Sequence, residues 1–118
     1  MTKKIDAHQH FWLYNSQRYA WIGDEMLQLK HDFLPDDLFP ILQRNGVEGT
    51  VAVQAVQDEE ENLFLLKLAE KHPYILAVVG WLDFKSPNLE TTIDSYKSHK
   101  KLKGFRHVLQ DEADPNFI

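Results

Sequence analysis

The sequence predicts an α/β fold in which four parallel strands alternate with three connecting helices, as in half of a closed (β/α)8 barrel. Apolar runs occupy residues 4–7, 47–56, 75–82 and 102–109. The two middle runs are almost continuous and rich in valine, which is typical of strands buried on both faces. The last three runs begin at nearly equal intervals, as expected of a repeated strand–helix unit.

The length of the chain sets how much of a barrel it can form. It has 118 residues, whereas a complete barrel of eight units typically needs ~250. Four parallel strands could instead form a small open doubly wound sheet. No Gly-x-Gly-x-x-Gly loop supports that alternative, so half a barrel is the favoured interpretation.

Composition excludes several classes of protein. The formal net charge of −5 and the pI of about 5.6 argue against nucleic-acid binding, which requires a cationic surface. The hydrophobic share of 43% and the absence of cysteine indicate a globular domain without disulfides, thiolate zinc sites or a cysteine nucleophile. No apolar run is long enough for a membrane span or a secretory signal, so we expect a soluble cytoplasmic protein with no membrane partner.

The first strand, at residues 4–7, precedes an unusually long connection. Residues 11–33 carry several aromatic side chains and follow the strand directly. Loops that follow barrel strands are where such folds place their ligand contacts. We therefore expect this aromatic segment to contribute to a binding site.

The first expected helix covers residues 36–45. Acidic residues at its start and Gly46 at its end are typical helix-terminal signals. Because proline interrupts fewer hydrogen bonds near a helix start, Pro40 is expected in the first turn.

The second expected helix opens at Asp58 and stops before Pro73. Asp58 is the expected N-cap, and Glu61 is expected to reach back to it in a capping box. The third helix is expected to start at Ser86 with Pro87 in its first position, and to end in a basic turn at residues 97–101.

The strongest chemical signal is the pair His8 and His10 at the end of the first strand. Strand side chains alternate between faces, so both imidazoles are expected on the same face, where they can share one cation such as zinc. Asp6 lies on that face as well, either as a partner of the ligands or as a polar core group. A pair of histidines without metal remains the alternative.

A second signal is the polar end of the fourth strand. Arg106 and His107 are candidates to hold an acidic or hydroxylated substrate, and since they are adjacent, at most one should face the lumen. The structural alternative pairs Arg106 with Asp111 or Glu112, because a buried guanidinium needs a partner.

Two further polar or aromatic residues lie at strand ends. Gln54 could hydrogen-bond a substrate or cap the backbone, and both interpretations stay open. Trp81 is expected in the core.

Several of these segments together resemble the lactonase branch of the amidohydrolase superfamily, the amidohydrolase 2 group with its L-fuconolactonase-like and L-rhamnonolactonase-like enzymes. Asp-Ala-His-Gln-His, Gly-Trp-Leu-Asp and Gly-Phe-Arg-His are the most specific motifs. The matching pieces occur in family order at residues 5–12, 33–38, 53–55, 61–62, 79–83 and 103–112.

The resemblance implies a TIM barrel of which residues 1–118 form the N-terminal half. It implies hydrolysis of a small-molecule sugar lactone, with His8 and His10 at the position of zinc or another divalent metal ion. The general-base aspartate would lie beyond Ile118, so this chain is expected to be inactive by itself.

Within that scheme, Arg106, His107 and Gln54 are the expected substrate-binding residues. A non-catalytic half-barrel that self-associates is the alternative from another class, because exposed sheet edges and an apolar lumen favour a homo-oligomer. A decarboxylase of the same superfamily is the second alternative.

Overall fold

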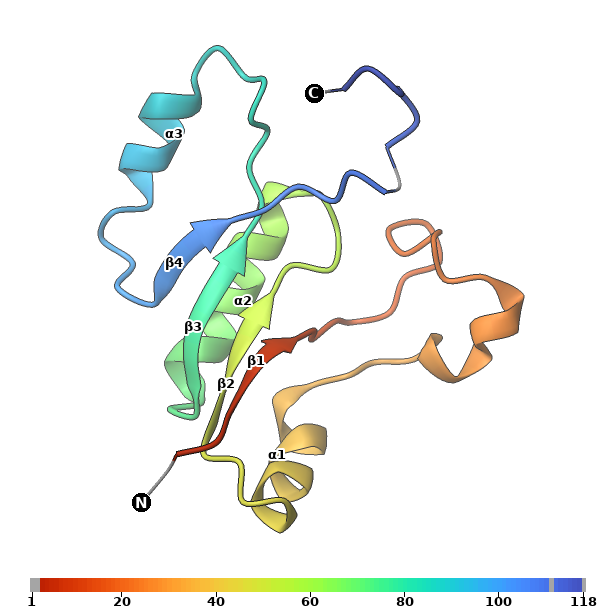
Figure 1. Cartoon of the computed structure of the whole chain (residues 1–118), viewed down its shortest axis with the longest axis vertical. Helices are drawn as coiled ribbons and strands as arrows, with labels where there is room; N and C mark the ends of the chain where they lie inside the picture. The colour runs from red at the N-terminus through yellow and green to blue at the C-terminus, as the bar shows by residue number, and fades with distance from the viewer. Residues whose placement is uncertain (1–2, 111, 118) are drawn as a thin grey trace.

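Four parallel strands form a sheet in the computed structural model, which describes residues 3–110 and 112–117 (Figure 1). The strands are β1 (Ile5–Gln9), β2 (Gly49–Val53), β3 (Ile75–Gly80) and β4 (Leu102–Phe105). The helices are η1 (Asp24–Leu29, a 3-10 helix), α1 (Pro35–Arg44), α2 (Glu59–Lys71) and α3 (Leu89–Ser95). The spatial order β1-β2-β3-β4 follows the chain, so all carboxyl ends lie at one edge. This arrangement confirms the predicted fold class.

The main core lies between the sheet and α2, which runs behind β2 and β3 in Figure 1. Ala52 and Val78 from the strands and Leu65 from the helix are fully buried there. Burial of such side chains contributes about 25 cal/mol for each Å² of apolar surface removed from water. This packing fixes where α2 begins, and therefore where its first turn meets the ends of the strands.

The start of α2 agrees with the sequence in one respect and differs in another. Asp58 is the N-cap, and its carboxylate accepts the Glu60 N–H at 2.8 Å. The expected capping box is wrong, because the carboxylate of Glu61 accepts N–H groups of Ala55 and Val56 instead. Helix α2 ends at Lys71, two residues before Pro73, as expected.

Helix α1 starts one residue earlier than expected, with Pro35 in its first position. The N–H of Leu34 is satisfied by the Asp37 carboxylate at 3.2 Å. Pro40 consequently lies in the second turn rather than the first, where it removes one helical hydrogen bond. Gly46 has a positive φ of 67°, a left-handed conformation that favours glycine directly after a helix.

The start of α3 differs more from the sequence expectation. Ser86 and Pro87 precede the helix, and Asn88 is the N-cap residue. The Ser86 hydroxyl accepts a hydrogen bond from the Asn88 N–H at 3.2 Å, and the Ser86 carbonyl accepts one from the Leu89 N–H at 3.3 Å. These bonds close a turn of their own, which explains why the helix begins only at Leu89.

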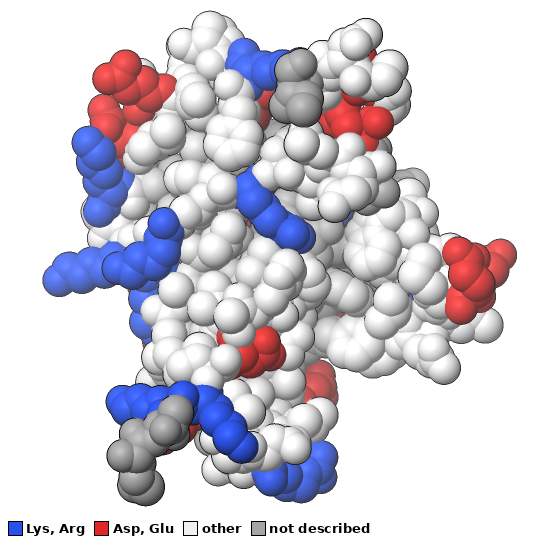
Figure 2. All heavy atoms as spheres, viewed as in Figure 1, with Lys and Arg blue, Asp and Glu red and all other residues white. Residues whose placement is uncertain are grey.

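The face of the sheet opposite α2 carries no helix in the described ranges. Val51, Ala77 and Val79 are partly exposed on the strands, whereas their neighbours Ala52 and Val78 are fully buried. Figure 2, which has the same view as Figure 1, shows that this face is largely uncharged around a few isolated basic and acidic groups. None of the helices described is both long enough and apolar enough to cross a bilayer.

A candidate active site at the carboxyl edge of the sheet

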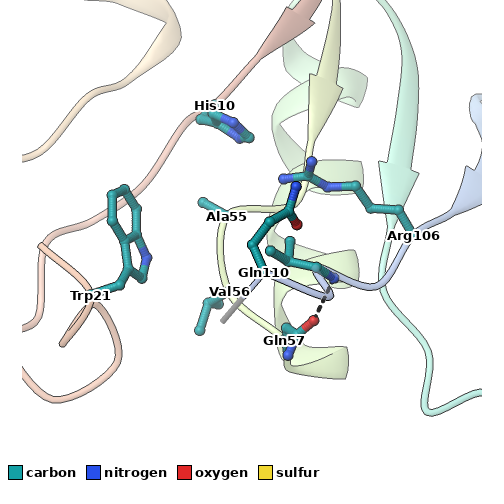
Figure 3. Close-up of a pocket in the computed structure, with 8 residues that line it drawn as sticks. His10, Trp21, Ala55, Val56, Gln57, Arg106 and Gln110 are labelled. Carbon is teal, nitrogen blue, oxygen red and sulfur yellow. Dashed lines mark hydrogen bonds between the residues drawn. The ribbon is translucent and has the colours of Figure 1, made fainter. Parts of the chain in front are cut away.

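An open cavity of about 470 Å³ lies at the carboxyl edge of the sheet (Figure 3). Its walls come from the segments that follow β1, β2 and β4. The lining residues are His10, Trp21, Ala55, Val56, Gln57, Arg106, Val108 and Gln110. The cavity thus combines one imidazole, one guanidinium and two amides with an apolar wall, which suits a small polar ligand.

His8 and His10 meet as the sequence led us to expect. Their Nε2 atoms are 3.2 Å apart, and the rings are arranged edge-to-face with centroids 4.9 Å apart. Nδ1 of His10 donates to the carbonyl oxygen of Val53 at 2.9 Å. A carbonyl oxygen only accepts, so neutral His10 carries its proton on Nδ1 and presents the Nε2 lone pair to His8.

A bulge in β1 accompanies this placement. Asp6 pairs with Thr50 and Gln9 with Ala52, so β1 has one residue more than β2 across this interval. The Asp6 carboxylate accepts the His8 N–H and the Gln9 side-chain amide, both at 3.1 Å. Asp6 therefore supports the bulged backbone and does not contact either imidazole ring through these bonds.

The two imidazoles fit part of a zinc site. Two nitrogens that each lie ~2.0–2.1 Å from a tetrahedral zinc ion are ~3.3–3.4 Å apart, close to the 3.2 Å between His8 and His10. The backbone hydrogen bond on the far ring nitrogen of His10 is typical of metal-binding histidines. In the described residues no third His, Cys, Asp or Glu joins them to complete a ligand group.

Burial lowers the pKa of His10 below its ordinary value of 6.5, and the charges of His8 and Arg106 act in the same direction. The hydrogen bond to Val53 opposes this effect. The net direction favours the neutral ring, which is the form that binds a metal ion or accepts a proton.

Arg106 points into the cavity towards His10 and Gln110 (Figure 3). Its Nε donates to Oε1 of Gln54 at 2.7 Å, and its Nη2 donates to the Gln54 carbonyl at 2.9 Å. Burial lowers the pKa of Arg106, but arginine remains charged in proteins. The cavity therefore contains a fixed positive charge.

The pairing of Arg106 with Glu112, which was the structural alternative to substrate binding, is not observed. Glu112 pairs with His107 instead, with 2.7 Å between Nε2 and Oε2. Asp111, the other partner named in that alternative, lies outside the described residues. Strand β4 ends at Phe105, so Arg106 and His107 both follow the strand and turn to different sides.

His107 does not line the cavity with Arg106. Nε1 of Trp81 donates to Nδ1 of His107 at 2.9 Å, which places the His107 proton on Nε2, facing Glu112. The ring stacks on Phe117 with 4.4 Å between centroids. Trp81 is partly exposed, so its expected place in the core is wrong. This group ties the C-terminal segment to the end of β3.

Two adjacent buried polar residues of α2 fix the loops around the cavity. Glu61 accepts the N–H groups of Ala55 and Val56, both at 3.0 Å. The Asn62 amide pairs with the Trp81 N–H and the Trp81 carbonyl, both at 2.7 Å. Burial raises the pKa of Glu61, against the lowering effect of its two backbone bonds. The first turn of α2 thus holds the chain beyond both β2 and β3.

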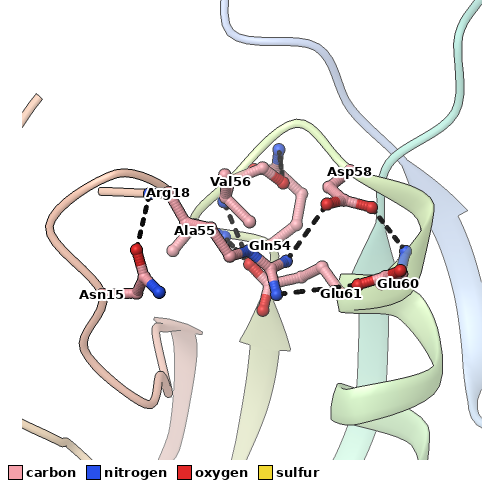
Figure 4. A network of polar contacts seen from close by, with 8 residues as sticks. All are labelled: Asn15, Arg18, Gln54, Ala55, Val56, Asp58, Glu60 and Glu61. Carbon is pink, nitrogen blue, oxygen red and sulfur yellow. Dashed lines mark hydrogen bonds and ion pairs between the residues drawn. The ribbon is translucent and has the colours of Figure 1, made fainter. Parts of the chain in front are cut away.

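The aromatic segment after β1 supplies one wall of the cavity. Trp12, Tyr19 and Ile22 form a small core of their own. Trp21, which is 42% exposed, packs edge-to-face on Trp12 and reaches the cavity. Arg18 joins this segment to the start of α2 through ion pairs with Asp58 at 3.4 Å and Glu60 at 3.9 Å (Figure 4).

The amidohydrolase family model matches residues 5–117 of this sequence. The chain belongs to the amidohydrolase family. The resemblance of its motifs to that superfamily is thereby confirmed.

Two curated relatives are enzymes named L-fucono-1,5-lactonase. The one from Burkholderia multivorans is 46% identical over 111 residues, which cover 94% of this chain and 37% of that enzyme. The one from Burkholderia ambifaria is 42% identical over 118 residues, which cover 100% of this chain and 41% of that enzyme. This amidohydrolase chain thus spans about two fifths of the length of these relatives.

Two crystal structures of an amidohydrolase from Burkholderia multivorans resemble the chain, one with bound zinc and one with bound HEPES. Each has a TM-score of 0.89 and 45% sequence identity, covering 96% of this chain and 39% of that one. The half-barrel architecture therefore occurs in a solved member of the family.

Sequence reasoning singled out His10 and Arg106, which line the cavity, and His8, which contacts His10, but it missed the two amides of the cavity, Gln57 and Gln110. They lie in loops, where no periodicity indicates which side chains turn inwards. The brace formed by Glu61 and Asn62 was also missed, although two polar residues next to an apolar helical stripe were a usable signal.

Proposed function

We propose that this chain forms the N-terminal half of a barrel enzyme that hydrolyses a sugar lactone to the corresponding aldonic acid. One observation carries the proposal: the imidazole of His10, which contacts that of His8, shares one cavity with the fixed guanidinium of Arg106 at the carboxyl edge of a parallel sheet. That edge is where barrel enzymes place their active sites. The lactonase names of the two relatives support hydrolysis of a lactone over decarboxylation.

In this proposal the residues of this chain bind the lactone and place a positive charge near its carbonyl group. Arg106 binds oxygen atoms of the lactone or of the product carboxylate, because a guanidinium offers paired N–H donors to both. Trp21 and Val56 exclude water from one side of the ligand. A positive charge close to the reacting carbonyl favours the negative charge that develops on its oxygen when water attacks.

His8 and His10 would hold a divalent metal ion, as their spacing and the hydrogen bond to Val53 allow. Such an ion polarises a carbonyl and makes bound water more acidic. The zinc in the related crystal structure supports this assignment. Zinc or another divalent ion is accordingly part of the proposed site.

No carboxylate is among the residues that line the cavity within the described ranges. We therefore place the general base of the reaction in the part of the relatives' length that this chain does not span. Without that group the attacking water loses its proton acceptor, and the 118-residue chain alone is expected to be inactive.

A chimaera tests the proposal: this chain replaces the matching two fifths of the Burkholderia multivorans L-fucono-1,5-lactonase. The chimaera should hydrolyse L-fucono-1,5-lactone in a pH-indicator assay, whereas the chain alone should not. His10→Ala in the chimaera should lower kcat/KM by on the order of 100-fold or more. A folded chimaera without activity, or turnover by the chain alone, would contradict the proposal.

A further inference from the structure

We infer that Gln54 is a positioning residue: it binds the side edge of the Arg106 guanidinium and so directs the end edge into the cavity. The inference deepens the proposed function and rests on it only for the identity of the ligand. Gln54 itself is fully buried and does not line the cavity, so its role is exerted through Arg106.

The geometry of the contact carries the inference. A guanidinium has five N–H donors, arranged as a side edge of Nε and Nη2 and an end edge of Nη1 and Nη2. Gln54 takes the side edge with two acceptors, its side-chain oxygen at 2.7 Å and its main-chain oxygen at 2.9 Å. The end edge is the part of Arg106 that remains for a ligand.

Gln54 is itself held in place by two hydrogen bonds, one of them to a residue that Glu61 fixes. Its N–H donates to the Val79 carbonyl at 2.8 Å, within the sheet. Its side-chain nitrogen donates to the carbonyl of Val56 at 3.3 Å, and Glu61 binds the N–H of that same residue. Rotation of Arg106 would therefore break contacts that the sheet and α2 both support.

This arrangement predicts the class of ligand. An end-on guanidinium presents two parallel N–H groups, which match two oxygen atoms on one carbon. A carboxylate has this pattern with a negative charge shared by two equivalent oxygens, whereas the acyl carbon of a lactone carries an uncharged carbonyl oxygen and a ring oxygen. We therefore expect Arg106 to bind the carboxylate of the aldonate product, with an affinity that depends on Gln54.

Arginine Nε–H signals in nitrogen-15 NMR spectra of the chain test the positioning. The chain has three arginines, and Arg18 and Arg44 are exposed, so Arg106→Lys identifies the Arg106 signal. In the unaltered chain, that signal should show the slowest hydrogen exchange of the three. If it exchanges as fast as the exposed ones, the inference is wrong without any variant.

Three variants separate positioning from packing. Gln54→Met keeps the volume but removes the side-chain acceptor, so exchange at Arg106 Nε–H should become on the order of 10-fold faster. Gln54→Glu keeps both acceptors and should preserve the slow exchange. Gln57→Met removes another amide of the cavity, one that binds the Val108 N–H, and should leave the Arg106 signal unchanged.

Titration with L-fuconate measures the consequence for binding. Both Gln54 variants should weaken binding on the order of 10-fold, Gln54→Met because Arg106 is no longer fixed and Gln54→Glu because its charge is neutralised. Unchanged exchange and unchanged affinity in Gln54→Met would show that Gln54 only fills space, which overturns the inference. If L-fuconate binds neither the chain nor the chimaera while Gln54→Met still frees Arg106, the proposed function fails and the positioning role holds.

Discussion

At the scale of single residues, His10 shows how a strand-end side chain is prepared for binding. One ring nitrogen is engaged by the Val53 carbonyl, and the other meets His8. Because the Val53 carbonyl of β2 fixes the tautomer, His10 needs no change of tautomer before it binds a cation. The pair was predictable from alternation along β1, although the bulge beside it was not.

We predict that the chain binds zinc through this pair. Loss of a hydrogen bond that merely supports a metal-binding side chain already lowers metal affinity about 10-fold. Removal of the side chain itself, by His8→Ala or His10→Ala, should therefore lower zinc affinity on the order of 10-fold or more. Competition with a fluorescent chelator measures the affinity. His99→Ala, which removes an exposed histidine elsewhere, should have no effect; equal affinities in all four proteins would contradict the assignment.

Glu61 should make stability depend on pH. Burial raises its pKa above the ordinary value of 4.5, so the folded state holds its proton more tightly than the unfolded state. The stability that Glu61 contributes is therefore fully present below pH 4.5 and is lost as the pH rises through the raised folded value.

Denaturant unfolding from pH 4 to pH 8 tests this sign. The stability of the unaltered chain relative to Glu61→Gln should fall as the pH rises. Glu70→Gln, a change at an exposed position of the same helix, should show no such trend. A difference that grows in favour of Glu61 with rising pH would show that its backbone bonds outweigh desolvation.

At the scale of elements, the strands were predictable and several helix starts were not. Continuous apolar runs placed β2 and β3 because such runs are typical of parallel strands, although in this chain the face opposite α2 is partly exposed. Helix starts depend on local hydrogen bonds that compete with one another. At Ser86 the hydroxyl closes a separate turn, and at Glu61 the carboxylate binds the preceding loop instead of Asp58.

The contact between β3 and α2 gives a sharp test of packing. A Cβ atom on Gly80 would overlap Oδ1 of Asn62, whose amide is bound to the Trp81 backbone and cannot move freely. Gly80→Ala should lower the free energy of unfolding by about 1–3 kcal/mol.

Gly104 in β4 provides the matched control. A Cβ atom there would meet nothing within 4 Å, so Gly104→Ala should change stability by no more than ~0.5 kcal/mol. Urea denaturation measures both variants. Equal effects at the two glycines would contradict the close approach of Asn62 to β3.

At the scale of the whole molecule, the sheet has β1 and β4 as its edges and, across residues 3–110 and 112–117, one face without a helix. Exposed edges and apolar surface favour association between chains. We therefore predict that the isolated chain forms a homo-oligomer, which sedimentation velocity at micromolar concentrations would detect. A monomer throughout that range would contradict this prediction.

A charge on the open face should weaken this association. Ala77→Lys places an ammonium group on a partly exposed position of β3, away from the residues that line the cavity. Leu63→Lys, at a position of α2 that is 51% exposed, is the control. The first variant should shift the distribution towards monomer, and the second should leave it unchanged; equal shifts would argue against the open face as the contact.

The brace at the start of α2 also has a meaning for how such a site changes over generations. Glu61 and Asn62 form hydrogen bonds with main-chain atoms at positions 55, 56 and 81, so these bonds do not depend on the side chains at those positions. Mutations can therefore change the side chains at positions 55 and 56, which line the cavity, while the backbone that carries them keeps its hydrogen bonds to Glu61. Substitutions at these two positions can therefore change which ligand the cavity prefers without destabilising the fold.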